Sequence, residues 1–411
     1  MVITGVGAVT ALALTAEETW QGLLVGRSGI DYVTGFDSSQ YPTRFAGQVK
    51  GFNPEDYMDR REARRLARFS QYGVAAARMA IADAGLTLSE EIADMAGVVL
   101  GNSAGSIPDI EDAVTKIRQG QARRLSPLFM VTFIPNIAAF HISSVLGLRG
   151  YSATICTACA AGTQAVGEAA AVIRRGQAQV MLTGGADAAV CETGLAGFTA
   201  MRGMSTYQGE PAKACRPFDR DRDGFLAAEG AAILVLETME HAVRRGARIY
   251  AEVAGAGVTC DNYNIAAPDP SGDGLARAMR MALRDAGMSP DEIDYINPHG
   301  SGTPLNDVME TIAIKKVFGD RAYRIPISST KSMLGHAMGA AGAIEAVVST
   351  LTIRDNIVHP TINLENPDPE CDLDYVPLVA RRVVVNAVMS NSNGLGGQNA
   401  SLILRRVGEK G

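Results

Sequence analysis

The 411-residue chain lacks the features that mark several large classes of protein. Aromatic residues make up only 6% of it, which argues against a surface that stacks nucleic-acid bases. Its formal net charge of −6 also disfavours nucleic acid as a partner. No apolar run approaches the roughly 20 uncharged residues of a membrane-spanning helix. We therefore expect neither nucleic acid nor a membrane among its partners.

Cysteine is scarce, and neither a leader nor a linker is recognisable. Six Cys in a chain of this length do not make a disulfide framework. The apolar N-terminus, MVITGVGAVTALAL, lacks the basic residues that open a signal peptide, so we expect a cytoplasmic protein. No Pro-, Ser- or Gln-rich tract divides the chain, although its length exceeds the roughly 250–300 residues at which one core usually splits. We expect two packed halves.

What the chain does contain is an alternation of short apolar β-rich runs with Ala-rich amphipathic segments. In the first half, strands are expected at 98–100, 180–183 and 231–237, and helices at 66–84, 162–175 and 239–245. After Gly246 the order starts again, with strands at 249–254, 293–296, 383–390 and 400–405, and helices at 274–286, 306–318 and 339–354. This alternation predicts an α/β fold with parallel sheets between helices. We place the boundary between residues 1–246 and 247–411.

The first candidate for chemistry is the stretch ATICTACAAG, residues 153–162. An apolar strand runs into small residues before a helix begins, so Cys159 is expected near the helix N-terminus. The helix dipole and free amides there would stabilise a thiolate and lower the pKa of the thiol. A buried structural cysteine fits the same pattern. Cys156 and Cys159 form a C-x-x-C pair, but the second ligand pair of a zinc site is not visible, so we expect no metal.

Two histidines lie in Gly-rich turns. His299 lies in DYINPHGSGTP after a strand, where a turn at the carboxyl end of a sheet would offer its ring to a ligand. His336 and Lys331 lie in SSTKSMLGHAMGAAG, and the helix that follows carries Glu345. A hydrogen-bonded structural histidine and a capped helix with solvated side chains are the alternatives. Of the remaining histidines, we expect His141 and His241 to be structural and His359 to be exposed.

A last Gly-rich stretch, SNSNGLGGQNA at 390–400, joins two late strands as a tight turn. Its spacing fits neither a P-loop nor a dinucleotide-binding fingerprint. One Cys and two His on separate strand ends form a constellation suited to a covalent acyl thioester and a stabilised enolate. A hydrolytic Cys–His pair would not need the second His.

These stretches, in this order, resemble the β-ketoacyl-[acyl-carrier-protein] synthases of the thiolase superfamily, and among them the type II elongating synthases. The likeness runs the whole length and is carried by VITGVGAVT, the Cys159 stretch, RPFDRDRDGFLAAEGAAILVLE, NPHGSGTP, STKSMLGHAMGAAGAIE and PTINLENPDP. It implies a five-layered αβαβα fold of two pseudo-duplicated halves, and a homodimer. It also implies substrates carried on the phosphopantetheine of an acyl-carrier protein, with no separate cofactor.

The resemblance implies a two-stage condensation in fatty acid biosynthesis. Cys159 would take an acyl group from acyl-carrier protein, and malonyl-carrier protein would then lose CO2 and condense with it. The product would be a 3-oxoacyl chain two carbons longer. His299 and His336 would stabilise the enolate, Lys331 would orient the second histidine, and Glu345 would complete the charge network.

The resemblance also implies which residues surround the substrate. The backbone N–H groups of Cys159 and Leu395 would form the oxyanion hole. Ser301 and Thr303 would hold the phosphopantetheine arm, and Phe198 would line the acyl pocket.

Two departures from the family pattern bear on the substrate. The late turn usually reads N-S-F-G-F-G-G, and here Asn393 and Leu395 replace both Phe residues, which leaves the shape of the gate over the nucleophile open. Ala104 stands where the subgroup often has Ile at the floor of the acyl pocket, which predicts a deeper or wider tunnel. The alternative function is therefore the ketosynthase of a type II polyketide or polyene system, paired with a chain-length partner in a heterodimer.

Two other activities on the same fold fit less well. A non-catalytic chain-length partner would lack the nucleophile, and Cys159 is present. A thiolase acting on coenzyme A esters would carry a second Cys in the late Gly-rich turn, and residues 390–400 contain none.

The segment RREARRLAR, residues 60–68, concentrates positive charge in an acidic chain. On a helix these charges would cover more than one face, and a solvated helix with internal ion pairs is one explanation. The other is a dock for an acidic carrier protein, which electrostatic steering favours. The predicted docking residues are Arg60, Arg61, Arg64, Arg65, Arg68, Arg123 and Arg124.

Overall fold

Two groups of strands, one from each half of the chain, organise the computed structural model, which describes residues 1–408. The first group has the order β5 (Ser152–Ile155), β4 (Ala96–Gly101), β6 (Val180–Ala188), β7 (Glu229–Glu237), β1 (Val2–Val9). The second has the order β8 (Ala251–Cys260), β13 (Gln398–Arg405), β12 (Ala387–Gly394), β9 (Tyr295–Asn297). Antiparallel pairing of residues 2–3 with residues 251–252 joins both groups into one nine-stranded sheet.

The fold is α/β, as expected, but strand pairing within each group is mixed, whereas we expected parallel sheets. β4 pairs parallel with β5 and β6, and β12 pairs parallel with β9. β7 and β13, in contrast, run antiparallel to both of their neighbours. The Gly-rich turn after β12 explains part of this, because antiparallel strands can be joined by a tight hairpin whereas parallel strands need a crossover.

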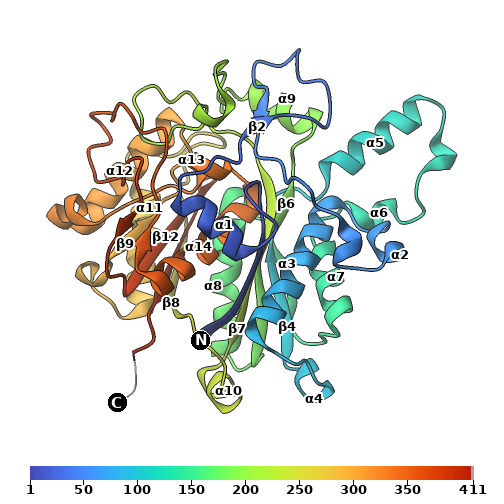
Figure 1. Cartoon of the computed structure of the whole chain (residues 1–411), viewed down its shortest axis with the longest axis horizontal. Helices are drawn as coiled ribbons and strands as arrows, with labels where there is room; N and C mark the ends of the chain where they lie inside the picture. The colour runs from blue at the N-terminus through green and yellow to red at the C-terminus, as the bar shows by residue number, and fades with distance from the viewer. Residues whose placement is uncertain (409–411) are drawn as a thin grey trace.

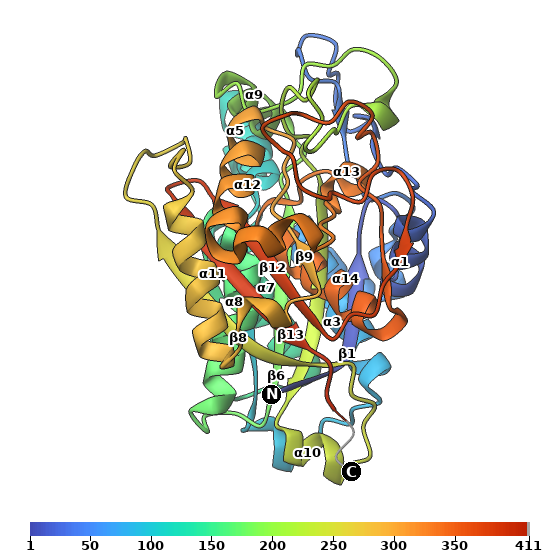
Figure 2. The ribbon, with the colours of Figure 1, turned by 90° about the vertical axis from the view of Figure 1, so that its left-hand side faces the viewer.

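Helices cover and separate the two groups of strands, as Figures 1 and 2 show. α3 (Arg68–Ala84) packs on the outer face of the first group, and α11 (Asp273–Ala286) packs on the outer face of the second. α8 (Ala161–Arg174) and α14 (Ala341–Asp355) lie between the groups and contact strands of both. The layers therefore follow the order αβαβα that the family resemblance implied.

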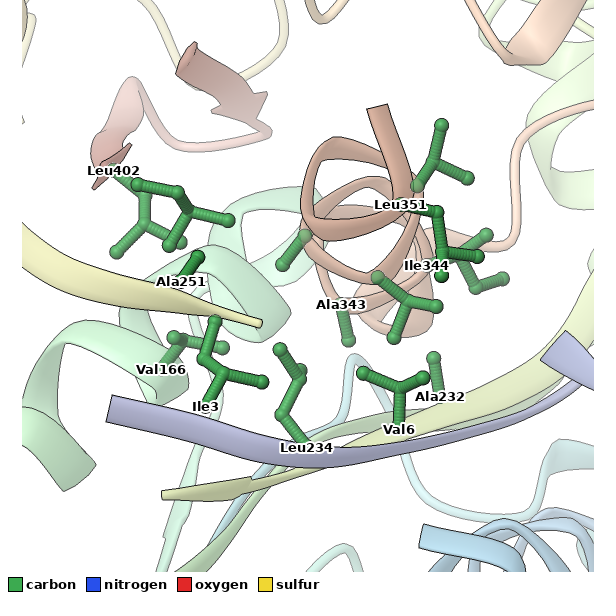
Figure 3. Packing of buried hydrophobic residues seen from close by; sticks show 14 of the residues in the cluster. Ile3, Val6, Val166, Ala232, Leu234, Ala251, Ala343, Ile344, Leu351 and Leu402 are labelled. Atoms are coloured by element: carbon green, nitrogen blue, oxygen red, sulfur yellow. The ribbon is translucent and has the colours of Figure 1, made fainter. Parts of the chain in front are cut away.

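The middle layer is tight because its two helices present small residues to each other. A Cβ on Gly162 of α8 would lie 2.7 Å from the backbone nitrogen of Ala343, and a Cβ on Gly342 of α14 would collide with the Thr163 hydroxyl. Figure 3 shows the apolar core next to this contact, where side chains of α14 and α8 pack over β1 and β7. The residues labelled there include Ile3, Val6, Ala232, Leu234, Ala343, Ile344 and Leu351.

The remaining elements are short or lie at the periphery of these layers (Figure 1). The helices among them are α1 (Ala16–Leu24), α2 (Arg60–Ala63), α4 (Glu90–Ala93), α5 (Ile107–Arg118), α6 (Phe129–Thr132), α7 (Ile137–Leu146), α9 (Glu192–Ala200), α10 (Met239–Arg244), α12 (Pro304–Phe318) and α13 (Lys331–Leu334). The strands among them are β2 (Asp31–Tyr32), β3 (Phe45–Ala46), β10 (Ile357–Val358) and β11 (Arg381–Arg382). None of the helices within residues 1–408 has the length and apolar character needed to cross a membrane.

The two halves of the chain repeat one order of elements. The series β1, α3, β4, β5, α8, β6, β7 is matched by β8, α11, β9, a bridge between Ile327 and Ile296, α14, β12 and β13. Matched strands occupy matched positions in the two groups. We propose that the halves meet between residues 246 and 247, because Gly246 (φ 66°) ends the turn after α10 and β8 begins shortly afterwards.

Candidate active site

A cavity of about 370 Å³ lies close to the point where the N-termini of α8 and α14 meet. Residues from both halves of the chain form its wall. The predicted site residues that line it are Cys159, Phe198, His299, Ser301, Thr303, His336, Asn393 and Leu395. Lys331 and Glu345 lie behind this wall, whereas Ala104 is exposed on the loop after β4 and does not reach the cavity.

Cys159 lies in a short 3-10 turn, η3 (Ala158–Ala160), that leads directly into α8. Ala158 has a φ of 48°, a left-handed conformation that is uncommon for a residue with a side chain. The glycine turn after β12 approaches this backbone closely, because a Cβ on Gly394 would lie 2.6 Å from the Thr157 carbonyl oxygen. The small residues around Cys159 thus bring a second segment of chain against the nucleophile.

The pKa of the Cys159 thiol is raised to about 11, which contradicts the lowered value that its place before a helix suggested. Burial is the largest cause. The charge of Lys331 and hydrogen bonds from the backbone N–H groups of Leu395 and Cys159 itself act in the opposite direction, but less strongly. The thiol is therefore protonated at neutral pH and must lose its proton before it attacks a substrate.

The two predicted histidines face each other beside Cys159. The ring centroids of His299 and His336 lie 5.1 Å apart with an interplanar angle of 84°. Burial, together with the charge of Lys331, holds the pKa of both rings well below the usual range. His299 Nδ1 and both ring nitrogens of His336 are buried without a hydrogen-bond partner in the part of the chain that is described. The rings are therefore neutral, and their unpaired nitrogens are free to hydrogen-bond a substrate.

The His299 loop is fixed by a carboxylate that sequence analysis missed. Glu310 of α12 accepts hydrogen bonds from the backbone N–H groups of His299 and Gly300, both at 2.8 Å. Burial raises the pKa of Glu310 to about 7. Its position on the buried face of α12 is the only feature that could have drawn attention to it.

Lys331 and Glu345 form a buried ion pair behind the histidines. Lys331, at 2% exposure, pairs with Glu345 of α14 and donates a hydrogen bond to the carbonyl oxygen of His299 at 2.6 Å. We expected Lys331 to orient the second histidine, but the His336 ring nitrogens receive no such bond within residues 1–408. The lysine holds the backbone of the first histidine instead.

Asp187, at the end of β6, is a second buried carboxylate that sequence analysis missed. It accepts hydrogen bonds from the backbone N–H groups of Ser103 at 2.9 Å and Gly339 at 3.1 Å. Burial raises its pKa to about 6. Asp187 thus ties the loop after β4 to the turn that precedes α14, next to the Met338 side of the cavity.

The cavity has one polar and one apolar wall. Along the polar wall the hydroxyl oxygens of Ser301 and Thr303 lie 3.0 Å apart, the backbone N–H of Asn306 donates to Thr303 Oγ1 at 3.3 Å, and the side chains of Asn306 and Asn393 are 2.8 Å apart. The apolar wall consists of Phe198, Met201, Phe225 and Met338. A ligand that enters here meets both hydrogen-bonding groups and aromatic and Met side chains.

Arg202 is a further residue of the wall that sequence analysis missed. It is exposed, has a φ of 55°, and forms no ion pair within the described chain. No motif in the sequence marks it. A free cation therefore stands beside the cavity.

The predicted docking arginines belong to two separate segments. The segment at 60–68 is not one helix, because α2 ends at Ala63 and α3 begins only at Arg68. Arg68 is half-buried, with its guanidinium over the ring of Phe52 and a hydrogen bond to the hydroxyl of Tyr72 at 2.8 Å. The arginines that remain exposed are Arg60, Arg61, Arg64 and Arg65, together with Arg123 and Arg124 between α5 and α6.

Two other predictions can be compared with the structure. His359 is fully buried rather than exposed, and burial lowers its pKa to about 4. Its ring lies 3.3 Å from the hydroxyl of Tyr295, a contact between distant segments that a Pro-containing loop gave no reason to expect. Among residues 1–408 there is no group of three or more His, Cys, Asp or Glu side chains arranged to hold a metal ion.

Comparison with protein families decides the relationship. The model of the β-ketoacyl synthase N-terminal domain matches residues 1–242, and the model of the C-terminal domain matches residues 250–365. The chain belongs to the β-ketoacyl synthase family. The family resemblance predicted from the sequence is thereby confirmed.

Relatives in this family match over nearly their whole length. The 3-oxoacyl-[acyl-carrier-protein] synthase 2 of Synechocystis sp. is 46% identical over 406 residues, covering 99% of this chain and 98% of the relative. The enzyme of the same name from Coxiella burnetii is 46% identical over 407 residues, with the same two coverages. The chain is therefore an acyl-transferring condensing enzyme.

Solved structures confirm the thiolase-like architecture. The ishigamide ketosynthase/chain length factor superposes with a TM-score of 0.93 at 39% identity. A β-ketoacyl synthase from Burkholderia phymatum superposes with a TM-score of 0.92 at 38% identity. Each comparison covers 99% of both chains.

Proposed function

We propose that the protein is a 3-oxoacyl-[acyl-carrier-protein] synthase of fatty acid biosynthesis. It transfers an acyl group to Cys159 and then condenses it with malonyl-[acyl-carrier-protein]. One observation carries this proposal. Cys159, His299 and His336 line one cavity, and the backbone N–H groups of Leu395 and Cys159 act to lower the pKa of the thiol.

The acyl transfer needs a base and an oxyanion hole. One of the two neutral imidazoles takes the thiol proton of Cys159, and the sulfur attacks the carbonyl carbon of the incoming thioester. The N–H groups of Cys159 and Leu395 stabilise the negative oxygen that forms. The C–S bond of the carrier thioester then breaks, and the carrier thiol leaves with a proton. The acyl group remains on Cys159.

The condensation uses both histidines as hydrogen-bond donors. Malonyl-carrier protein loses CO2, and the electrons of the broken C–C bond form an enolate. N–H groups of His299 and His336 stabilise its oxygen. The enolate carbon attacks the acyl-Cys159 carbonyl, the C–S bond breaks, and the sulfur leaves. The product is a 3-oxoacyl-carrier protein two carbons longer.

The buried Lys331–Glu345 pair supports this step through the backbone. Lys331 contacts the carbonyl of His299, and its charge adds to burial, the larger cause, in lowering the pKa of both rings, which keeps them neutral. Ser301 and Thr303 hold the phosphopantetheine arm, Phe198 lines the acyl pocket, and the Asn393–Leu395 turn covers the nucleophile.

Two substitutions at Cys159 test the two half-reactions. Cys159→Ala should abolish formation of the acyl-enzyme, whereas Cys156→Ala, a change at the exposed neighbouring cysteine, should leave it intact. Cys159→Gln should keep malonyl decarboxylation while condensation is lost. A labelled acyl group trapped by Cys159→Ala would contradict the nucleophile assignment. Absence of decarboxylation in Cys159→Gln would contradict the roles given to the histidines.

The substrates arrive on an acyl-carrier protein that docks on the exposed arginines. Arg61, Arg64 and Arg65 are exposed and form no ion pair within residues 1–408, so their charge is available to an acidic partner. A neighbouring structure, at TM-score 0.90 and 35% identity, is a type II polyketide ketosynthase in complex with its acyl-carrier protein. Arg68 contributes chiefly to packing, and Arg123 and Arg124 extend the surface.

Charge reversal tests this dock. Arg64→Glu with Arg65→Glu should raise the KM for carrier-protein substrates far more than the KM for small thioesters, because only the carrier is acidic. The matched control is Arg244→Glu on α10, at another end of the molecule (Figure 1). Equal effects on both substrate types would reject the dock.

The protein acts in the cytoplasm as a homodimer. β5 is an edge strand, and edge strands left open are a liability. Exposed apolar side chains gather on the helices nearby in sequence, namely Ile110, Val114, Ile117, Met130, Val131 and Phe140. Ala104 is exposed and lies just before α5 in the chain, so the partner covers it and closes the acyl pocket. Unpaired cysteines are consistent with a reducing compartment.

A second candidate is the ketosynthase of a type II polyketide or polyene system, in a heterodimer with a chain-length partner. The likeness to the ishigamide ketosynthase/chain length factor favours it. The replacement of both Phe residues by Asn393 and Leu395 points the same way. Mass spectrometry of the acyl-enzyme formed from a ladder of acyl-carrier proteins would separate the two functions.

A further inference from the structure

Asn393 places an unsatisfied carbonyl beside the nucleophile. The residue lies at the end of β12, next to the turn that contacts the Cys159 backbone. Its side-chain oxygen, Oδ1, is buried and has no hydrogen-bond partner in the described part of the chain. A buried acceptor without a donor is costly, and native structures seldom keep one without a use. The usual Phe at this position would present no such group.

A chain of hydrogen bonds fixes which end of the Asn393 amide is free. Asp307 is a carboxylate that accepts the backbone N–H groups of Phe218 at 2.8 Å and Gly302 at 3.2 Å, with Arg222 Nε 3.5 Å away. Because a carboxylate only accepts, Asn306 must turn its NH2 group toward Asp307, at 3.2 Å. Asn306 then offers its oxygen to Asn393.

The same logic orients Asn393. Its Nδ2 donates to Asn306 Oδ1 at 2.8 Å, so the group left over is the carbonyl oxygen and not the NH2. If the Asn393 amide were turned over, its oxygen would lie against Asn306 Oδ1 at this distance, and two acceptors would repel each other. The site therefore presents an acceptor, and the ligand group that completes it must be an N–H or O–H donor.

The position of Asn393 favours one source for that donor. Hydrogen bonds connect Asn393 to Asn306 and Asn306 to Thr303, so both Asn residues continue the polar lining formed by Ser301 and Thr303. An acyl chain suits the apolar wall. A pantetheine arm carries secondary amides, and the first of them lies two methylenes from the thioester sulfur. Its carbonyl can accept from a hydroxyl of the polar wall, which leaves its N–H for an acceptor close to Cys159.

We propose that Asn393 is a substrate-binding residue whose side-chain oxygen accepts a hydrogen bond from the pantetheine amide nearest the thioester. The inference rests on the proposed function. Asn393 thereby sets the depth at which the thioester carbonyl stops, between His299 and His336. Binding through the arm replaces the apolar contact that the usual Phe would make.

The test compares malonyl-pantetheine thioester with an analogue in which that amide is an ester, so that only the N–H is lost. The wild-type enzyme should decarboxylate the analogue with a kcat/KM about tenfold lower, the scale expected when a buried acceptor loses its partner. For the Asn393→Leu variant, the kcat/KM values of the amide and ester substrates should differ by less than about twofold. Asn393→Phe provides a second variant that removes the carbonyl if the Leu variant does not fold.

Three results would overturn the inference. Equal amide-to-ester ratios in the wild type and in a folded variant would reject Asn393 as the acceptor, while leaving the condensing function intact. The amide and ester substrates could react equally well while the enzyme prefers 3-hydroxyacyl over saturated primers, with a preference that Asn393→Leu removes. The donor to Asn393 would then be the hydroxyl of the acyl chain and not the amide of the pantetheine arm. Failure of the wild type to decarboxylate either substrate would reject the proposed function itself.

Discussion

Each half of the chain contributes one turn to the active site, and the two turns match in backbone geometry but carry different residues. η3 (Ala158–Ala160) precedes α8, and η7 (Met338–Ala340) precedes α14. Ala158 and Met338 both have a φ of 48°. The residue that follows is Cys159 in one turn and Gly339 in the other. One backbone geometry thus serves a nucleophile in the first half and a glycine in the second.

The partners of the two turns explain the difference. The backbone N–H of Cys159 faces its own sulfur, whereas that of Gly339 donates to the buried Asp187 at 3.1 Å. A Cβ on Gly339 would lie 2.6 Å from the backbone nitrogen of Ser103. Position 339 therefore has no room for a side chain, and its amide is already bonded, so it cannot hold a nucleophile as position 159 does.

The links that lead into the two turns also differ. Residues 156–157 join β5 to η3, whereas residues 328–337 join the Ile327 bridge to η7. The longer link contains α13 and brings His336 to the cavity and Lys331 to the buried ion pair behind it. The duplicated fold therefore places the nucleophile in one half and the groups that handle charge in the other.

Removing the charge in the longer link should have the largest effect. Lys331→Met leaves the carboxylate of Glu345 buried without its cation, so the free energy of unfolding should fall by about 3–5 kcal/mol. Chemical denaturation would measure it. The matched control, Lys315→Met, breaks a partly exposed pair with Asp372 and should cost less than about 1 kcal/mol. Equal losses of unfolding free energy in the two variants would show that the Lys331–Glu345 pair is not a special buried pair, and would contradict the role given to the longer link.

The rate at which Cys159 reacts with an alkylating reagent should show how far burial of the first turn raises the pKa of its thiol. With a pKa of about 11 instead of the ordinary 9, its thiolate fraction at pH 8 should be about a hundredfold lower. The rate of iodoacetamide labelling should therefore rise about tenfold per pH unit from pH 7 to pH 10, in a background where the exposed Cys156 and Cys260 are Ser. A plateau below pH 8 would show instead that the turn stabilises the thiolate.

A methyl group in the second turn should have the smallest of these effects. Gly339→Ala must displace the backbone of the Ser103 loop, and overpacking of this kind costs about 1–3 kcal/mol. The control Gly197→Ala lies in α9 with nothing near its Cβ, and should be neutral or slightly stabilising. The comparison of the two turns fails if both variants have the same melting temperature.

Sequence reasoning located the site because its residues lie in local patterns. Small residues before a helix marked Cys159, and Gly-rich turns after strands marked His299 and His336. The groups that hold these residues, Asp187 and Glu310, were not predicted. Each is an ordinary acidic residue whose role arises only when segments far apart in the chain are packed together.

The same limit explains the predictions that were wrong. The helix N-terminus suggested a low pKa for Cys159, but the burial that raises it comes from several distant segments. His359 looked exposed beside a proline, and the tertiary fold buried it. Ala104, placed at the pocket floor by family likeness, is exposed and does not line the cavity of the single chain.

Peptide mass spectrometry after brief incubation with an acyl-carrier protein substrate tests the central claim most directly. The acyl mass should appear on the sulfur of Cys159 and leave Cys156, three residues earlier in the same peptide, unmodified. Addition of malonyl-carrier protein should then discharge it as a 3-oxoacyl product. An acyl group on Cys156, or a folded enzyme that stays unmodified, would contradict the account.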